Sequence, residues 1–158
     1  MKRNLKFEIN YDINYTLIGL RSKTEDYQFA YSLNKSSFFL FYRLNKDISY
    51  IINKKKIYFS VYKDWNEILK RQSFLISNKS FYISDLDSTG NLFDQNTIAN
   101  TAFLIPELKE FDYFIKLIGI WKEEEISILK SYLNNMKTVE LETTIQLKLI
   151  KSINNLVF

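Results

Sequence analysis

The segment from Phe38 to Ile83 constrains the fold more than any other part of this 158-residue chain. β-Branched and aromatic residues occur there in short runs, and polar residues interrupt the runs at short intervals. The interruptions lie at residues 45–47, 53–56, 63–64 and 77–80. Short runs separated by turn residues are typical of antiparallel strands joined by tight connections. We therefore expect an antiparallel meander over this segment.

The flanking residues predict two helices and a further strand. An apolar run at residues 15–20 is expected to form a strand. Ser22 and Glu25 have the spacing of a capping box, in which each side chain bonds a free backbone N–H, so we expect a helix to start there. A second helix is expected after Trp121, because residues 123–125 place three glutamates in its first turn. The expected apolar positions are Tyr27, Ala30 and Tyr31, with Phe29 and Leu33 alongside, in the first helix, and Ile126, Leu129, Leu133 and Met136 in the second.

The second half of the chain is expected to contain a long loop and three more strands. Residues 84–100 include Gly90 and many polar side chains, which favours an exposed loop. Strands are expected at residues 101–105, 112–118 and 139–147. Pro106 cannot donate a hydrogen bond to a sheet, so the first of these strands has to end before it or lie at an edge.

The pattern as a whole predicts a single α+β domain over residues 1–158, with a mainly antiparallel sheet and two helices packed on one face. Hydrophobic residues make up 46% of the chain and aromatic residues 16%, which is ample for one packed core. No repeat and no Pro- or Gly-rich linker divides the sequence. No run approaches the roughly 18 apolar residues of a membrane span. We expect a cytoplasmic protein, since the chain has no cysteine for disulfides.

The chain also contains no histidine, which together with the missing cysteine restricts the chemistry. A Ser-His-Asp triad has no imidazole here, and a cysteine nucleophile has no thiol. Zinc, copper, haem and iron–sulfur sites usually draw on these two residue types, so only all-oxygen metal sites are left. The three glycines lie singly, which excludes a Walker A loop and a GxGxxG loop. We expect no catalytic residue, no metal and no cofactor.

Residues 105–113, Ile-Pro-Glu-Leu-Lys-Glu-Phe-Asp-Tyr, form the most distinctive motif of the chain. They resemble the signature of the IPExxxVDY family of small bacterial proteins, with Phe111 in place of the usual valine. The resemblance extends from residues 25–27 to residues 154–158. It implies no activity, cofactor or catalytic residue. We call residues 105–113 the signature turn, and the residues expected to have structural roles in it are Pro106 and Tyr113.

The acidic side chains of the signature turn are the first candidate site. These side chains are Glu107, Glu110 and Asp112. Carboxylates on an exposed turn suit contact with a macromolecule, so we predict a partner-binding surface. Two other interpretations stay open. The carboxylates could serve acid–base or magnesium chemistry, or they could cap the turn and pair with Lys109 or Lys116.

A second candidate site combines lysines with aromatic residues and predicts nucleic-acid binding. Its members are Lys54, Lys55, Lys56, Tyr58, Tyr62 and Lys63. On one strand, Tyr58, Ser60 and Tyr62 share a face, which would offer rings for base stacking beside ammonium groups for phosphates. The alternative is a lysine-rich hairpin turn, whose charge protects a strand end from aggregation.

The segment that contains Asp85, Asp87, Thr89 and Gly90 matches two further motifs. The order Asp-x-Asp-x-Thr resembles the nucleophile motif of haloacid-dehalogenase phosphatases, but no paired aspartates follow it to bind magnesium. The same residues resemble the first half of a calcium loop, in which Asn96 would replace the last glutamate ligand. A polar turn is the simplest interpretation.

The leading functional prediction is a non-enzymatic cytoplasmic interaction protein that binds an unidentified protein partner through the signature turn. The shortage of catalytic residue types supports it, as does the uneven charge. The net charge is +4, with a basic excess in residues 1–79 and an acidic excess in residues 80–158. An RNA-associated factor that uses the lysine–tyrosine face is the alternative, and a metal-dependent hydrolase is a third interpretation. The oligomeric state stays open.

Overall fold

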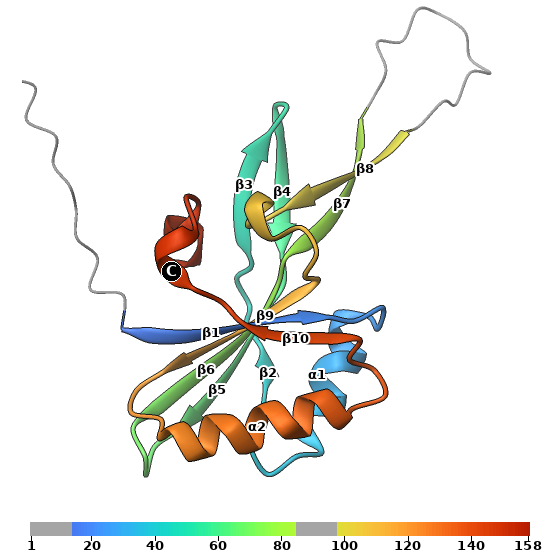
Figure 1. The fold of residues 1–158 in the computed structure, drawn as a ribbon. Coiled ribbons are helices and arrows are strands. Elements are labelled where there is room, and N and C mark those ends of the chain that lie inside the picture. The colour runs from blue at the N-terminus through green and yellow to red at the C-terminus, as the bar shows by residue number, and fades with distance from the viewer. Residues whose placement is uncertain (1–13, 85–97) are drawn as a thin grey trace, which may run out of the picture.

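The computed structural model of the chain describes residues 14–84 and 98–158, and Figure 1 shows the order of its elements. The strands are β1 Tyr15–Arg21, β2 Tyr42–Arg43, β3 Ile48–Ile52, β4 Lys55–Phe59, β5 Val61–Asn66, β6 Arg71–Ser77, β7 Lys79–Ser84, β8 Ile98–Phe103, β9 Tyr113–Ile118 and β10 Leu141–Thr144. The helices are α1 Asp26–Asn34 and α2 Glu123–Asn135, and the short 3-10 turns are η1 Pro106–Leu108, η2 Leu147–Leu149 and η3 Ile153–Leu156.

Six strands form one antiparallel sheet in the order β10-β1-β9-β6-β5-β2. Two further antiparallel pairs, β3-β4 and β7-β8, project together beyond this sheet (Figure 1). The predicted fold class is therefore confirmed: an α+β architecture with a mainly antiparallel sheet and two helices.

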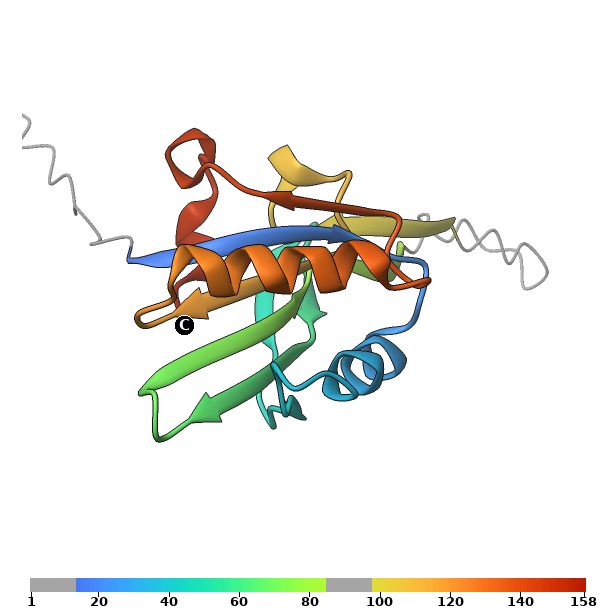
Figure 2. The ribbon, with the colours of Figure 1, turned by 60° about the horizontal axis from the view of Figure 1, so that its bottom comes forward.

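Both helices pack on the same face of the six-stranded sheet, and Figure 2 shows α2 lying along it. Their buried residues are Phe29, Ala30 and Leu33 in α1 and Leu129 and Leu133 in α2. These side chains share one hydrophobic cluster with sheet residues such as Ile18, Leu75 and Ile115. The spacing of the buried leucines in α2 is the helical repeat that the sequence predicted.

The opposite face of the sheet is covered by the two strand pairs, the signature turn and the C-terminal segment. Apolar side chains from all of these parts form a second cluster, which includes Ile57, Phe59, Ala102, Leu104, Ile105, Phe111, Ile150 and Leu156. Strands β1 and β9 are consequently covered on both faces. This explains why each carries a nearly continuous apolar run with buried centres in place of an alternating pattern.

Two nearly continuous pairs of strands, β4 with β5 and β6 with β7, diverge from each other in the middle of the molecule. Only Ser60 lies between β4 and β5, and only Asn78 lies between β6 and β7. Strand β5 pairs with β6, and the ladder extends as far as the Ser77 N–H, which donates to the Ser60 carbonyl at 3.0 Å. Beyond this point β4 pairs with β3 and β7 pairs with β8. We call the divergence of β4 from β7 the fork.

The predicted capping box at the first helix is wrong. Helix α1 begins at Asp26 with Glu25 as its N-cap, and no side chain caps it. The Ser22 hydroxyl accepts the Thr24 N–H at 3.2 Å, while the Ser22 N–H donates to Asp112 at 2.9 Å. Ser22 therefore binds the distant signature turn, and the helix starts later than its local spacing indicated.

Several predicted positions also shift. Tyr27 and Tyr31 are 61% and 66% exposed, because the buried stripe of α1 runs through its other apolar residues. Residues 63–64, predicted as a turn, lie inside β5. Both ends of the expected loop at 84–100 belong to strands, because β7 extends to Ser84 and β8 begins at Ile98. Strand β10 is shorter than the expected strand at 139–147.

Gly19 of β1 makes a close approach that predicts a stability effect. A Cβ atom on Gly19 would lie 2.8 Å from Cγ of Phe111 and 3.0 Å from Cδ1 of Ile145. Because the Phe111 ring is buried, we expect Gly19→Ala to lower the free energy of unfolding by about 1–3 kcal/mol. Urea denaturation measures this change.

A double-mutant cycle tests whether the Phe111 ring is the cause. In the Phe111→Val background, where the side chain at position 111 is smaller, the same Gly19→Ala change should cost clearly less. Equal costs in both backgrounds would contradict the predicted clash.

Candidate functional site

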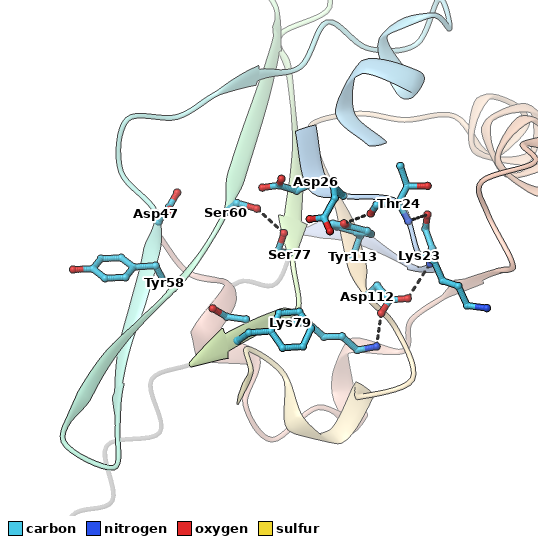
Figure 3. Close-up of a pocket in the computed structure, with 14 residues that line it drawn as sticks. Lys23, Thr24, Asp26, Asp47, Tyr58, Ser60, Ser77, Lys79, Asp112 and Tyr113 are labelled. Carbon is cyan, nitrogen blue, oxygen red and sulfur yellow. Dashed lines mark hydrogen bonds and ion pairs between the residues drawn. The ribbon is translucent and has the colours of Figure 1, made fainter. Parts of the chain in front are cut away.

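A cleft of about 550 Å³ opens where β4 and β7 diverge (Figure 3). Three parts of the chain line it: the fork, the connection from β1 into α1, and the end of the signature turn. The lining includes Tyr58, Ser60, Ser77, Lys79, Phe81, Asp112 and Tyr113, with residues 22–26 on the other side. The volume lies within the range of about 300–1,000 Å³ found for ligand sites.

Asp112 joins the three parts of the lining. One carboxylate oxygen forms an ion pair with Lys79, and the other accepts the Ser22 N–H at 2.9 Å. Its main chain also bonds on both sides, since its N–H donates to Leu20 and its carbonyl accepts the Asn78 N–H, each at 2.8 Å. The carboxylate is thus fixed at the edge of the cleft by β1 and β7.

Tyr113 is buried in the core, and its residue also lines the cleft. The residue is 7% exposed, and its ring packs on Phe29 with 4.8 Å between centroids. Its hydroxyl donates to the Thr24 carbonyl at 2.5 Å. Burial raises the pKa of Tyr113 above its usual value, and the negative charges of Asp26, Glu25 and Asp112 raise it further. The phenol therefore stays neutral, and it lies in the negative electrostatic potential of these carboxylates.

Negative charge dominates the cleft. Its carboxylates are Glu25, Asp26, Asp47 and Asp112, and its ammonium groups are Lys23 and Lys79. Lys79 pairs with Asp112, Arg43 pairs with Asp47, and Lys23 reaches out to Glu140 at 3.2 Å. Within residues 14–84 and 98–158, Glu25 and Asp26 make no ion pair. Two carboxylates are therefore left to attract a cation from outside.

The side chains that line the cleft are suited to binding a ligand. A serine nucleophile needs an adjacent base, whereas the Ser60 hydroxyl bonds the Ser77 hydroxyl at 2.5 Å. In the described part of the chain no three acidic residues lie close enough together to bind a metal ion. The exposed rings of Tyr58 and Phe81 add apolar contact area beside the carboxylates. This combination can bind a cationic and partly apolar ligand.

Asn78 shapes the signature turn, and the sequence pattern did not identify it as important. The residue is fully buried between β6 and β7. Its amide nitrogen donates to the carbonyls of Leu108 and Phe111, both at 2.9 Å. Its amide oxygen accepts the Ile105 N–H at 2.8 Å. One side chain therefore fixes both ends of the turn against the strand that enters the fork.

The three acidic residues predicted as one partner-binding surface point to different places. Asp112 lines the cleft, and its cation is Lys79 in place of the expected Lys109 or Lys116. Glu107 accepts the N–H and the hydroxyl of Ser152, at 2.9 and 3.1 Å. Glu110 is exposed, and its carbonyl accepts the Arg21 Nε–H at 3.1 Å. The structure thus gives the three residues different contacts, and their role as one partner-binding surface stays a prediction.

Glu107 instead fastens the C-terminal segment to the signature turn. Burial opposes its charge, but hydrogen bonds from its own main chain and from Ser152 outweigh this and lower the pKa of Glu107. Beside it, Asn155 donates to the Leu104 carbonyl at 2.8 Å. The buried Lys116 donates to the Leu156 carbonyl at 2.6 Å, and burial lowers the pKa of Lys116. Strand β8 ends at Phe103, and Pro106 begins η1 after the buried residues Leu104 and Ile105.

The structure divides the predicted lysine–tyrosine face. Tyr58 lies in β4 and is 53% exposed, whereas Tyr62 lies in β5 and is 7% exposed. Lys63 extends over the Phe74 ring in the six-stranded sheet, and Lys55 donates to the Ile83 carbonyl. Lys54 and Lys56 stay exposed near the β3-β4 turn. The expected continuous face is wrong, because the chain changes sheets at Ser60.

The remaining motif matches and the comparisons give no further site. Residues 85–90 and 96, which carry the phosphatase-like and calcium-like patterns, lie outside the described residues. No helix in the described ranges is long and apolar enough to cross a bilayer. The chain matches no family model, no curated protein and no solved structure. Membership of the IPExxxVDY family therefore stays a prediction.

Proposed function

We propose that this chain is a non-enzymatic interaction protein whose cleft binds a basic segment of a partner protein. The observation that carries the proposal is the position of Asp112 and Tyr113. These two residues of the signature turn line the same cleft as Glu25 and Asp26. The proposal keeps the predicted role of the signature turn but limits it to the end that reaches the cleft.

Charge and shape both favour a basic peptide. The carboxylates outnumber the ammonium groups in the cleft, and two of them lack an ion pair among the described residues. A lysine or arginine side chain that enters the cleft would form hydrogen bonds with these carboxylates. Its approach would also displace water from the carboxylates, which strengthens the electrostatic attraction. The rings of Tyr58 and Phe81 would contact the aliphatic parts of such side chains.

Removing the two unpaired carboxylates should weaken binding. We expect the double variant Glu25→Gln/Asp26→Asn to bind a lysine-containing peptide about tenfold more weakly, because each partly exposed charge pair contributes up to about 1 kcal/mol. Fluorescence anisotropy with a labelled peptide of alternating lysine and valine measures this change.

The matched control is Glu123→Gln/Glu124→Gln, which removes the same charge from the exposed start of α2, away from the cleft. Its affinity should stay close to that of the unchanged protein. Equal weakening by both double variants would show that only net charge matters, which would contradict the proposed site.

RNA binding is the second candidate, and one observation favours it. Lys56 lies over the exposed Tyr58 ring with 5.5 Å between the ammonium and the ring centre, next to the exposed Lys54. Phosphates there would approach the carboxylate of Asp47, which also lines the cleft. Tight binding of single-stranded RNA that is lost in Lys54→Glu/Lys56→Glu, together with no peptide binding, would replace the first proposal by this one.

A further inference from the structure

We infer that the partner segment binds as an additional β-strand along the edge of β7 that faces the fork. This inference rests on the proposed function and specifies how the peptide is held. It depends on main-chain hydrogen bonds with the strands that form the cleft walls, whereas the proposed function depends on the charge of the carboxylates. Peptides that add a strand to an open sheet edge gain affinity from main-chain hydrogen bonds.

The directions of the β7 backbone follow from two hydrogen bonds. Asn78 accepts the Leu104 N–H with its carbonyl at 2.8 Å, so this carbonyl faces β8. Ser77, one residue earlier, donates its N–H to Ser60 at 3.0 Å and faces the β4 side. Because successive residues of a strand face opposite edges, the outward groups of β7 belong to Lys79, Phe81 and Ile83.

Lys55 confirms that this edge is directed into the fork. Its ammonium group on β4 donates to the Ile83 carbonyl on β7. A side chain from the opposite wall thus satisfies the outermost of these carbonyls. In the described ranges β4 and β7 form no ladder with each other, and Phe81 is one of the residues that line the cleft. Unpaired edge groups of this kind are a template for a further strand.

The β4 edge presents matching groups on the other side of the fork. Asn53 and Lys54 have φ values of 50° and 65°, which is the type I′ turn of a two-residue hairpin. In such a hairpin the closing pair, Ile52 and Lys55, exchanges hydrogen bonds, and every second residue of β4 then faces β3. The backbone N–H and carbonyl of Tyr58 therefore point toward β7 and would face the added strand.

The occupant that fits is an extended segment with basic side chains at alternate positions. Side chains on one face of an added strand would point to the side where Glu25 and Asp26 lie, beside Tyr58 and Phe81. The other face would meet the apolar cluster that contains Ile57 and Tyr82. An alternating basic and apolar sequence satisfies both faces at once.

Backbone methylation separates strand addition from simple charge attraction. The probe is a seven-residue peptide of alternating lysine and valine with blocked ends. Its comparison peptide has the same side chains, but N-methyl groups replace alternate N–H donors. We expect the first peptide to bind the full chain at least tenfold more tightly and to slow hydrogen exchange at the Phe81 amide.

The possible outcomes distinguish failure of strand addition from failure of the proposed function. Equal affinity of the two peptides, with weakening by Glu25→Gln/Asp26→Asn, would overturn strand addition and leave the proposed function intact. Binding of neither peptide would overturn both. Protection of amides elsewhere, without protection at Phe81 or Tyr58, would also overturn strand addition.

A pair of substitutions at Phe81 gives a second test within the protein. Phe81→Ala and Phe81→Pro both remove the exposed ring, but only proline removes the outward N–H, which is not part of the ladder with β8. We expect Phe81→Pro to bind the peptide at least fivefold more weakly than Phe81→Ala, with both variants folded by circular dichroism. Equal affinity of the two variants would contradict the role of this N–H.

Discussion

Replacing Tyr113 with alanine is expected to lower the free energy of unfolding by about 3–5 kcal/mol, the usual cost of truncating a buried aromatic residue. The ring is 7% exposed and packs 4.8 Å from Phe29, so it connects β9 to helix α1. Its loss would leave a cavity between the sheet and this helix. It would also remove the hydroxyl that bonds the Thr24 carbonyl at the start of the cleft.

Two comparison variants make the Tyr113 result specific. Tyr113→Phe keeps the ring and should cost only about 1 kcal/mol, the net value of one hydrogen bond. Tyr58→Ala removes a ring that is 53% exposed and should have little effect on stability. Urea denaturation gives all three values, and an unchanged midpoint for Tyr113→Ala would refute its place in the core.

Alkaline pH provides an independent check on Tyr113. Burial, followed by the charges of Asp26, Glu25 and Asp112, raises the pKa of this phenol in the folded state. A raised pKa means that the folded state favours the protonated form, so the contribution to stability is complete below the ordinary tyrosine pKa of about 10 and is lost above it. Tyr113→Phe should therefore lose less stability between neutral pH and pH about 11 than the unchanged protein.

Local patterns predicted the elements whose formation depends on their own residues. Helix α2 carries Glu123, Glu124 and Glu125 in its first turn, as the sequence predicted, and it buries Leu129 and Leu133 of the expected helical repeat. Strands β1 and β9 also follow from their apolar runs. In these segments local preference and tertiary packing agree, so the pattern alone is sufficient.

The failures have a common physical cause in contacts between distant residues. Ser22 has the local spacing of a cap, but a hydrogen bond to Asp112, distant in the sequence, takes its N–H. Tyr58 and Tyr62 have the spacing of one strand face, but the chain changes sheets at Ser60 and buries the second ring. Neither the long-range hydrogen bond nor the change of sheet can be predicted from the pattern of neighbouring residues.

The candidate site was predictable only in part for the same reason. The motif identified Asp112 and Tyr113, which line the cleft, together with Glu107, which instead holds the C-terminal segment. Glu25 and Asp26 lie in the region of family resemblance, yet only the folded chain shows that they share a cleft with Asp112. Asn78 was interpreted as one polar residue of a turn, because its three side-chain hydrogen bonds reach residues 27 to 33 positions away.

Asn78→Ala is expected to destabilise the protein by about 3–5 kcal/mol, although the side chain is small and polar. The change would leave the Ile105 N–H and the Phe111 carbonyl buried without their partner, and each such group costs about 1–3 kcal/mol. The Leu108 carbonyl, which is only partly buried, would lose its bond at a lower cost. The matched control is Asn154→Ala, which removes an exposed amide side chain and should have little effect.

Asn78→Asp tests whether hydrogen bonding, and not packing, is responsible. Aspartate has nearly the same shape and keeps an oxygen for the Ile105 N–H, but it presents an acceptor where asparagine donates to Leu108 and Phe111. We expect this variant to lose as much stability as Asn78→Ala at neutral pH, as measured by urea denaturation. Asn78 directly precedes Lys79, and its N–H donates to the Asp112 carbonyl, so a displaced signature turn should disturb the Lys79–Asp112 ion pair and weaken peptide binding. A stable Asn78→Asp variant with normal peptide affinity would contradict both effects, since the signature turn would then keep its shape without the amide.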